Sequence, residues 1–278
     1  MCGEKGQKVN RLCLYFGYSR SGYYKSLRTI IQSDLTEAVV VDLVGSVRRY
    51  QPMIGGKKLY SLLKADLAKP GSRVGRDKFF DILRKQKLLI KRRRRYVTTT
   101  DCYHRFRKYN NKVKDQLLTG PGQVIVSDIT YLRTSSGFVY LFLQTDAWSR
   151  KITGWHLSES LGIAGALKAL EMSIRQYPST LGTIHHSDRG IQYCCDAYVS
   201  ALQEAGMEIS MTEENHCYEN AQAERVNGIL KQEFLLDSVF ADKQEAFKAV
   251  KEAIYTYNYR RPHWSLNLRI PIQLHNAA

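Results

Sequence analysis

Three acidic residues stand where a folded chain could bring them together. Asp128 lies within an apolar run over residues 123–132, and Asp188 ends another apolar run over residues 183–188. Runs of this kind are typical of buried strands, so each is predicted to carry a carboxylate on or at the end of a strand. Glu224 is predicted to lie about one turn inside a helix. Asp188 is 60 residues after Asp128, and 35 residues separate Asp188 from Glu224.

Carboxylates gathered at one place repel each other unless a cation lies among them. Mg²⁺ prefers oxygen ligands, and two such ions about 3.5–4 Å apart activate an attacking oxygen and stabilise a leaving one. If folding brings them together, Asp128, Asp188 and Glu224 could form a catalytic site that binds two Mg²⁺ ions, with Mn²⁺ as a substitute. The alternative is three unrelated surface carboxylates among 26 acidic residues, which the spacing alone would favour.

Residues close to these carboxylates in sequence are predicted to support them. Strand alternation aims His186 at the same face as Asp188, near the phosphate or in position to orient the carboxylate, while His185 faces the other way and packs. Asp146 ends another apolar run and is predicted to cap a turn or support the site rather than to bind metal. Asn220 could cap the helix that carries the third carboxylate.

The same helix carries two candidates for DNA contacts. Glu224 and Lys231 are seven residues apart and so lie nearly on one face, with Asn227 between them on that side. We predict that Lys231 holds a phosphate close to the metal site and that Asn227 also faces the DNA. The alternative for Lys231 is an ordinary solvated helix residue.

Positive charge is concentrated in the first part of the chain. The formal net charge is +16, but residues 1–119 hold 28 Lys and Arg against 9 Asp and Glu, and residues 120–278 hold 14 against 17. The first part is therefore predicted to meet a polyanion such as DNA, with strongly salt-dependent binding. A basic surface kept for solubility would explain the total charge but not its segregation.

Several classes of protein are excluded by composition. No run approaches ~18 consecutive apolar residues, and the N-terminus lacks the apolar region of a signal peptide. The six cysteines include no Cys-x-x-Cys pair. We therefore expect a reduced, cytoplasmic chain without a structural zinc site or a membrane span.

Elements of the first part read as helices. Residues 9–28 resemble the end of a helix-turn-helix, with a second short helix that offers Arg20 and Lys25 to DNA; an ordinary helical hairpin is the equal alternative. Further helices are predicted over residues 34–50, from Gly55 to about residue 67, and over 74–89. A basic run, Arg92, Arg93, Arg94 and Arg95 after Lys91, is predicted to be an arm lying on phosphates, with a free solvated run as the alternative.

Beyond residue 120 the pattern changes to strands. Strands are predicted over residues 124–132, 137–145, 151–157, 183–188 and 207–211, and helices over 162–177, 193–205, around Glu224 and over 243–259. The order β-β-β-α-β-α-β-α suits a ribonuclease-H-like α/β fold. The predicted organisation is a helix-turn-helix-like all-α DNA-binding region (1–95), a linker or flanking helix (96–119), a catalytic core (120–240), and a C-terminal helix and tail (241–278).

Four short sequence words carry a family resemblance. They are residues 127–131 (Ser-Asp-Ile-Thr-Tyr), 146–155, 186–193 and 257–263 (Tyr-Asn-Tyr-Arg-Arg-Pro-His). Together with the Asp-Asp-Glu spacing, these words resemble the integrase catalytic core of polynucleotidyl transferases. In particular they resemble a group of bacterial insertion-sequence transposases made from two overlapping reading frames. The chain is similar to the second-frame (OrfB) product over nearly its whole length.

The resemblance implies a fold, a reaction and partners. The fold is again ribonuclease-H-like, and the reaction is metal-dependent: water frees a 3′-hydroxyl at an element end, and the hydroxyl attacks another phosphodiester, integrating the element into target DNA. Implied partners are the terminal inverted repeats, target DNA, further copies of the chain on DNA, and a first-frame (OrfA) protein or a fusion with it. A nucleoid-associated location follows.

Two points stay open at this level. The pair Arg260 and Arg261 could clamp DNA, which the resemblance favours, or could tie down the C-terminus. The chain itself could be a fragment of an active fusion or an independent form. Rival functions are a nuclease of the same fold that cuts without strand transfer, and a DNA-binding regulator with an inert core.

Overall fold

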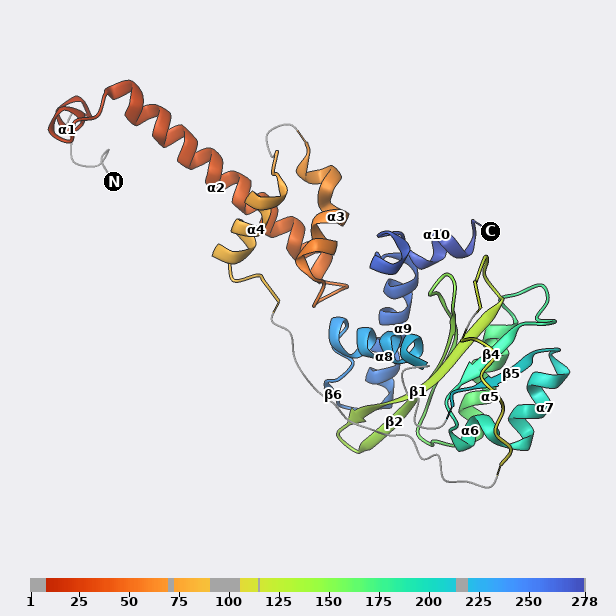
Figure 1. The fold of residues 1–278 in the computed structure, drawn as a ribbon. Coiled ribbons are helices and arrows are strands. Elements are labelled where there is room, and N and C mark those ends of the chain that lie inside the picture. The colour runs from red at the N-terminus through yellow and green to blue at the C-terminus, as the bar shows by residue number, and fades with distance from the viewer. Residues whose placement is uncertain (1–8, 70–72, 91–105, 115, 214–219, 278) are drawn as a thin grey trace. The chain divides into compact units, whose positions relative to one another are not determined.

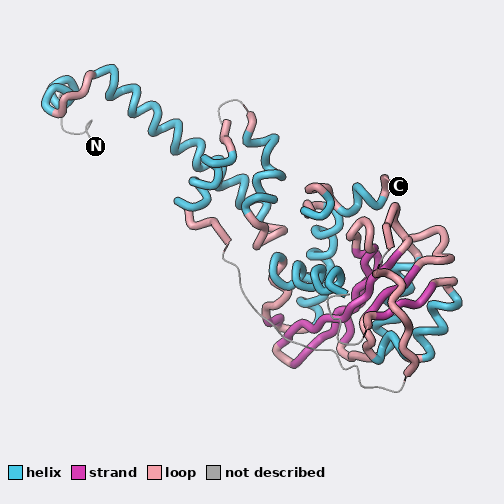
Figure 2. Tube along the Cα trace, viewed as in Figure 1, coloured by secondary structure: helices cyan, strands magenta, loops and turns pink. Residues whose placement is uncertain are grey.

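The chain divides into two compact units. A computed structural model describes residues 9–69, 73–90, 106–114, 116–213 and 220–277 (Figures 1 and 2). One unit comprises Met1–Arg48 with Gly55–Ile90, and the other comprises Arg49–Ile54 with Lys91–Ala278. The segment Arg49–Ile54 thus belongs with the larger unit although it lies between two helices of the smaller one. No helix within the described residues is long and apolar enough to cross a membrane.

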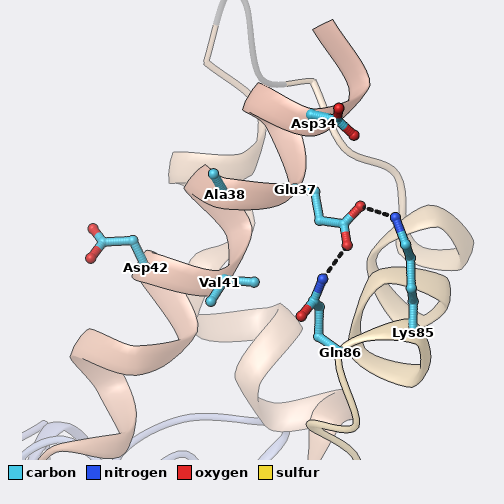
Figure 3. A pocket seen from close by; sticks show the side chains of 7 residues that line it. All are labelled: Asp34, Glu37, Ala38, Val41, Asp42, Lys85 and Gln86. Carbon is cyan, nitrogen blue, oxygen red and sulfur yellow. Dashed lines mark hydrogen bonds and ion pairs between the residues drawn. The ribbon is translucent and has the colours of Figure 1, made fainter. Parts of the chain in front are cut away.

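The smaller unit is helical. Its helices are α1 (Val9–Tyr15), α2 (Arg20–Arg48), α3 (Gly56–Leu67) and α4 (Arg76–Lys85). The second half of α2 packs against α3 and α4. Their shared core contains Val40, Val44 and Val47 of α2, Leu59, Leu63 and Leu67 of α3, and Phe79 and Leu83 of α4. At the edge of this core, the buried Glu37 carboxylate accepts hydrogen bonds from Lys85 Nζ at 2.7 Å and from Gln86 Nε2 (Figure 3).

Helix α2 corrects the expectation of two helices in its place. The short helix predicted before residue 28 and the helix predicted over 34–50 are one helix of 29 residues. Its start is capped, because Gly22 N–H donates to Ser19 Oγ at 3.0 Å. Residues 29–33 contain neither Gly nor Pro. Once a helix has formed, extending it costs little, so it continues through this interval. The predicted helix-turn-helix is therefore a short helix followed by a long one.

The larger unit is built on a six-stranded sheet. The strands are β1 (Val124–Thr134), β2 (Gly137–Asp146), β3 (Ile152–Ser158), β4 (Ile184–Ser187), β5 (Glu208–Met211) and β6 (Val239–Phe240). The order is β3-β2-β1-β4-β5, with β6 pairing to the end of β1. The first three strands are antiparallel, whereas β4 is parallel to β1 and β5 is parallel to β4. This mixed sheet confirms the predicted α/β class and the order of its strands.

Helices cover both faces of this sheet. They are α5 (Ile163–Ile174), α6 (Ile191–Cys194), α7 (Asp196–Glu204), α8 (Ala221–Glu233), α9 (Lys243–Tyr259) and α10 (Pro271–His275). Phe142 of β2 packs with α5, α6 and α7, whereas its neighbours Leu141 and Leu143 pack with α8 and α9. Because successive strand residues point to opposite faces, the two helix layers lie on opposite sides of β2 (Figure 1).

Three local features differ from the sequence expectations. The helix expected over 193–205 is interrupted at Cys195, whose extended backbone separates α6 from α7. Strand β6 has only two residues, too few to give a periodic signal. No helix occurs in residues 106–114 and 116–119, the described part of the stretch where a linker or flanking helix was expected. Lys112 N–H of that stretch instead donates to Ser210 Oγ of β5 at 2.9 Å.

Candidate active site

Two of the three predicted carboxylates come from neighbouring parallel strands. Strands β1 and β4 pair in the register Val124 with Ile184 through Val126 with His186. Two residues further along this register, Asp128 of β1 stands beside Asp188, which directly follows β4. Gly190 N–H donates to Asp188 Oδ1 at 3.0 Å, so the turn after β4 helps to orient that side chain. Parallel pairing therefore brings together two residues that are 60 positions apart.

The third carboxylate, Glu224, lies in the first turn of α8. Two side chains at the start of this helix bind backbone carbonyls of β1 and of the turn after β2. Asn220 Nδ2 donates to the carbonyl of Ser127 at 3.2 Å, and Gln222 Nε2 donates to the carbonyl of Ala147 at 3.0 Å. Asn220 occupies the N-cap position, but its side chain makes no cap hydrogen bond, so the predicted capping role is wrong. Its side chain ties α8 to the strand residue before Asp128.

Asp128 is held by two hydrogen bonds. Its Oδ1 accepts from Ile129 N–H at 2.9 Å, and its Oδ2 accepts from Asn227 Nδ2 at 2.7 Å. Burial raises the pKa of Asp128 to about 7, the charge of Asp188 adds to this rise, and Glu224 contributes a smaller increase. The two hydrogen bonds oppose the rise. The three acidic groups are therefore close enough to share one electrostatic environment.

This environment suits a divalent cation. Asp128 is raised in pKa because its negative charge is poorly solvated and faces another carboxylate, and a bound cation would relieve both effects. Glu224 is exposed in the first turn of α8. Within the described residues no three His, Cys, Asp or Glu side chains, these three included, lie together as a group that could hold a metal ion. The donors themselves are all carboxylate oxygens, which are the ligands that Mg²⁺ and Mn²⁺ prefer.

Asn227 has a role that the sequence analysis assigned wrongly. It was expected to contact DNA, but its side chain is 7% exposed and donates to Asp128 Oδ2. Its own Oδ1 is buried without a hydrogen-bond partner. Asn227 therefore orients the carboxylate rather than binding DNA.

Lys231 lies beside the carboxylates on the same helix. Its Nζ stands 4.3 Å from the centroid of the Tyr131 ring of β1. Burial lowers the pKa of Lys231, and the charges of Asp128 and Asp237 oppose this decrease. The side chain is therefore half-buried against the strand that carries Asp128, not extended into bulk solvent.

The two adjacent histidines point to opposite faces of β4. His186 Nδ1 lies 2.9 Å from Ser210 Oγ and so joins β4 to β5. His185 is fully buried on the other face, and burial lowers its pKa to about 3, so its ring is neutral. Its Nε2 lies 2.6 Å from Ser127 Oγ and 2.9 Å from Tyr198 Oη.

A buried polar network extends from His185. Gln144 completes it, because its Oε1 accepts from Ser127 Oγ at 2.6 Å and its Nε2 donates to Tyr198 Oη at 2.9 Å. The network joins β1, β2, β4 and α7 directly behind Asp128. The sequence does not predict this network, because its one local signal is a group of polar residues inside otherwise apolar runs.

Asp146 ends β2, where it pairs with Ile125, three residues before Asp128 on β1. It is fully buried, and its Oδ1 accepts from both the N–H and the Oγ of Ser149 at 2.7 Å. Its Oδ2 accepts from Gly122 N–H at 2.7 Å and from Tyr177 Oη at 3.2 Å. Asp146 therefore caps the turn after β2 and is occupied by four donors, so it is not positioned as a metal ligand.

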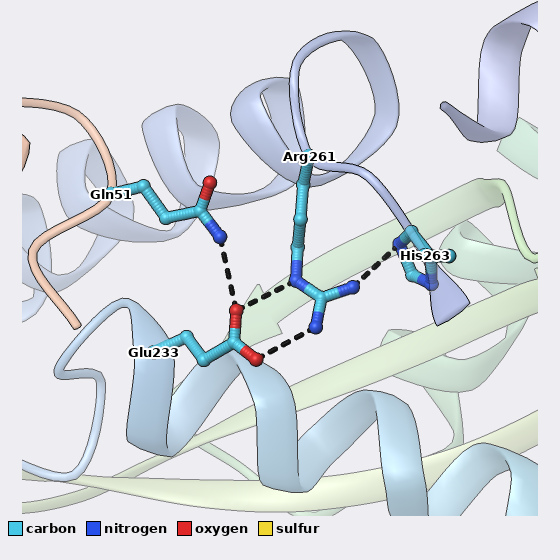
Figure 4. A network of polar contacts seen from close by, with 4 residues as sticks. All are labelled: Gln51, Glu233, Arg261 and His263. Carbon is cyan, nitrogen blue, oxygen red and sulfur yellow. Dashed lines mark hydrogen bonds and ion pairs between the residues drawn. The ribbon is translucent and has the colours of Figure 1, made fainter. Parts of the chain in front are cut away.

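The two arginines after α9 differ in their surroundings, and Figure 4 shows those of Arg261. Arg261 is 1% exposed and bonds the Glu233 carboxylate through Nε at 2.8 Å and Nη2 at 2.7 Å. Its Nη1 lies 2.8 Å from His263 Nε2. Gln51 Nε2 also donates to Glu233, at 3.0 Å. The prediction that Arg261 contacts DNA is therefore wrong: it ties the C-terminal segment to the end of α8.

The remaining basic candidates stay exposed or lie outside the described residues. Arg260 is exposed, with its guanidinium 4.9 Å from the centroid of the Tyr50 ring. Arg20 and Lys25 are exposed on the first turns of α2. Arg92, Arg93, Arg94 and Arg95 lie outside the described residues. Their assignment to DNA stays a prediction.

The raised pKa of Asp128 predicts a pH-dependent stability difference. In the metal-free folded chain Asp128 keeps a proton up to a pKa of about 7, whereas its ordinary pKa is 3.8. Between these values the folded state binds more protons than the unfolded state, so this residue's contribution to stability falls as pH rises. We therefore compare the free energy of unfolding of metal-free Asp128→Asn with that of the metal-free wild type. The variant's advantage should be larger at pH 8 than at pH 4, by up to about 4 kcal/mol.

This difference is measured by urea denaturation of both proteins in a chelator at pH 4 and pH 8. Addition of Mg²⁺ at pH 8 should stabilise the wild type more than the Asp128→Asn variant. A difference between the two proteins that is the same at both pH values would contradict the pKa assignment.

Comparison with known proteins gives consistent matches. Residues 119–217 and residues 205–271 match two family models, each described as integrase core domain. The chain is 33% identical over 258 residues to an uncharacterized 31 kDa protein of insertion element IS600 from Shigella sonnei, covering 91% of this chain and 93% of that protein. It is 28% identical over 271 residues to transposase InsF of insertion sequence IS3A from Escherichia coli K12, covering 92% and 90%.

A solved structure also aligns with part of the chain. The catalytic core domain of HTLV-2 integrase, in complex with magnesium, is 17% identical with a TM-score of 0.44, covering 56% of this chain and 97% of that one.

Proposed function

Because the chain belongs to the bacterial insertion-sequence transposases with an integrase core domain, we propose that Asp128, Asp188 and Glu224 form the site at which it cuts and joins DNA. The membership confirms the resemblance carried by the four sequence words. The chain is a DDE-type polynucleotidyl transferase, and its function is DNA transposition with strand transfer and integration. The alternative of a DNA-binding regulator with an inert core is thereby excluded.

An integrase core uses a divalent metal ion. We propose that this ion is Mg²⁺, that two ions are bound, and that Mn²⁺ substitutes for it. The observation that carries the proposal is the shared environment of the three acidic groups, in which Asp128 has a pKa of about 7. When bound, the metal would supply activation of the attacking oxygen and stabilisation of the leaving oxygen. Asp128 and Asp188 would hold it from the strands, and Glu224 would reach it from α8.

The chain's own residues position the reacting groups. Asn227 holds the Asp128 carboxylate by its hydrogen bond to Oδ2, and Asn220 fixes the start of α8 on β1. Lys231, half-buried beside Tyr131, provides a positive charge on the same helix as Glu224. We propose that it holds a phosphate at the DNA end. In this arrangement water would free a 3′-hydroxyl at the element end, and the hydroxyl would attack another phosphodiester.

The remaining parts of the proposal concern partners. The excess of positive charge in residues 1–119 supports binding of the terminal inverted repeats and of target DNA by the helical unit. We also propose that several copies assemble on DNA, that a first-frame protein or a fusion with it takes part, and that the chain acts in the cytoplasm at the nucleoid. We further propose that the chain is organised as a helical DNA-binding region (1–95), a catalytic core (120–240) and a C-terminal helix and tail (241–278).

The proposal is tested by incubating the full chain with labelled element ends and Mg²⁺ and sequencing the joined products. We expect junctions in which a 3′ end of the element is covalently joined to another phosphodiester. Cut ends without any junction would identify a nuclease and overturn the proposed mechanism of strand transfer.

Replacement of Lys231 tests its proposed role in positioning. Lys231→Ala should lower the rate of joining at saturating DNA by one to two orders of magnitude, because a lost charge-assisted contact is worth roughly 1.5–3 kcal/mol. Overall DNA affinity should change little, since many other cations support it. The matched control is Arg225→Ala, which removes an exposed charge from the same helix. A joining rate within about twofold of the wild type would identify Lys231 as a solvated residue, worth less than ~0.5 kcal/mol.

A further inference from the structure

A row of large apolar side chains is exposed along the first part of α2. Tyr24, Leu27, Ile31, Leu35 and Val39 recur at intervals of three or four residues and so share one face of the helix. Their exposed fractions range from 38% at Leu27 to 58% at Leu35. We call this set the α2 row. A contiguous apolar surface of this kind is typical of an interaction site.

The row does not belong to the core of the helical unit. Val40, Val44 and Val47, which are the buried valines of the same helix, pack against α3 and α4. At about 100° per residue, these valines lie on the side of α2 opposite to the row. The helix therefore has one apolar face that is used inside the unit and a second that is exposed.

The charges beside the row are segregated along the helix. Arg20, Lys25 and Arg28 all precede Ile31, whereas Asp34 and Asp42 follow it. All five side chains are exposed. The basic half would suit DNA or an anionic membrane surface. The acidic half, however, would be repelled by either surface, and the exposed aliphatic side chains would stay in contact with water on DNA. A protein helix with the reverse order of charges matches the whole length.

A second copy of α2 supplies this reverse order if it runs antiparallel. When two such helices cross at Ile31, Leu27 of one lies level with Leu35 of the other, and Tyr24 lies level with Ala38. The basic half of each copy then faces the acidic half of the other, with Arg20 level with Asp42. A parallel pair would instead place like charges level with each other.

A groove in the helical unit fits one part of this pairing. It has a volume of about 510 Å³ and lies between α2 and the end of α4 (Figure 3). Asp34, Ala38 and Asp42 line its α2 side, and the charge of Lys85 in the groove is balanced by its ion pair with Glu37. In the antiparallel pair this acidic groove lies level with Arg20 and Tyr24 of the second copy. The partner's positive charge and aromatic ring would enter an acidic recess beside the row.

We propose that the α2 row is a homodimerisation surface at which two copies of the chain pair antiparallel about Ile31. This inference rests on the proposed assembly of several copies and assigns it a surface. It does not depend on catalysis, because the association is measured without DNA or metal. Failure of the joining assay would therefore not contradict the dimerisation surface, and a monomeric chain would not contradict the proposed catalytic site.

The surface is tested by sedimentation of the full chain at 1–50 µM (a range on the order of ordinary dimer affinities) without DNA. We expect a monomer–dimer equilibrium whose dissociation constant rises at least about tenfold in Ile31→Glu, because two carboxylates then meet at the dimer axis. The matched control is Ser26→Glu, which adds the same charge at an exposed position on the other side of the helix and should leave the constant unchanged. Circular dichroism confirms that each variant is folded.

The orientation is tested by exchanging the charges. Arg20→Asp and Asp42→Arg should each weaken the dimer, and the double variant should restore it to within about threefold, since each new charge again faces its opposite. No recovery in the double variant, or no weakening in either single variant, would show that Arg20 and Asp42 do not face each other and would overturn the antiparallel pairing. A wild-type chain that stays monomeric over the whole range would also overturn it, leaving the row to a different protein.

Discussion

Asp188→Asn is expected to lower the rates of DNA cleavage and joining by at least about 10³-fold, equivalent to about 4 kcal/mol of transition-state stabilisation. An amide keeps the size of the side chain and its acceptor for Gly190 N–H, so the turn after β4 should be preserved. It removes the negative charge that the proposed metal site requires. DNA affinity should change little, because most of the basic residues lie elsewhere in the chain.

The measurement compares single-turnover cleavage and joining with DNA binding on the same labelled ends. Asp196→Asn is a matched control, because it makes the same chemical change at an exposed position on α7. Cleavage above about one-tenth of the wild-type rate in the Asp188→Asn protein would remove Asp188 from the catalytic site. Equal loss of DNA binding would point to an unfolded variant rather than to a chemical role.

Arg261→Ala is expected to destabilise the larger unit by about 3–5 kcal/mol. The guanidinium is buried and makes two hydrogen bonds to Glu233 and one to His263 (Figure 4). Its removal leaves the Glu233 carboxylate, whose side chain is 17% exposed, without its bidentate cation. An unpaired charge in that position costs more than the ion pair contributes, and the vacated volume adds a further cost.

Urea denaturation measures this effect, and the neighbouring arginine supplies the control. Arg260→Ala removes an exposed side chain and should cost less than ~0.5 kcal/mol. A double variant, Glu233→Met with Arg261→Met, should lose less stability than Arg261→Ala, because no charge is left buried. Equal effects of Arg260→Ala and Arg261→Ala would show that losing the buried arginine changes the free energy of unfolding no more than losing an exposed one.

Features that depend on neighbouring residues were predictable from the sequence. The apolar runs around Asp128 and Asp188 identify β1 and β4, because a buried strand has a local signal. The bounds of α9 agree with the prediction over residues 243–259 for the same reason. The family words then make the catalytic assignment specific, since spacing alone would favour unrelated surface carboxylates.

Features that depend on distant partners were not predictable. Asn227 has the polarity of a DNA contact until the fold places Asp128, 99 residues earlier, against its amide. Arg261 looks like its neighbour Arg260 until Glu233 and the packing of Tyr257 enclose it. The continuity of α2 is different in kind, because the error was to infer a break where the sequence contains no residue that ends a helix.

The segment Arg49–Ile54 has a consequence for how the chain can be divided. It follows α2 and precedes α3, yet Gln51 is fully buried on Glu233 and Met53 N–H donates to the Glu233 carbonyl at 3.1 Å. The polypeptide therefore passes from one unit to the other and back before its final passage after Ile90. No single cut in the chain therefore separates the two units. A truncated protein that begins at residue 91 or later would lose the segment Arg49–Ile54 and leave the Glu233–Arg261 pair open to water. Removal of the helical unit would therefore weaken the end of the helix that begins near Glu224.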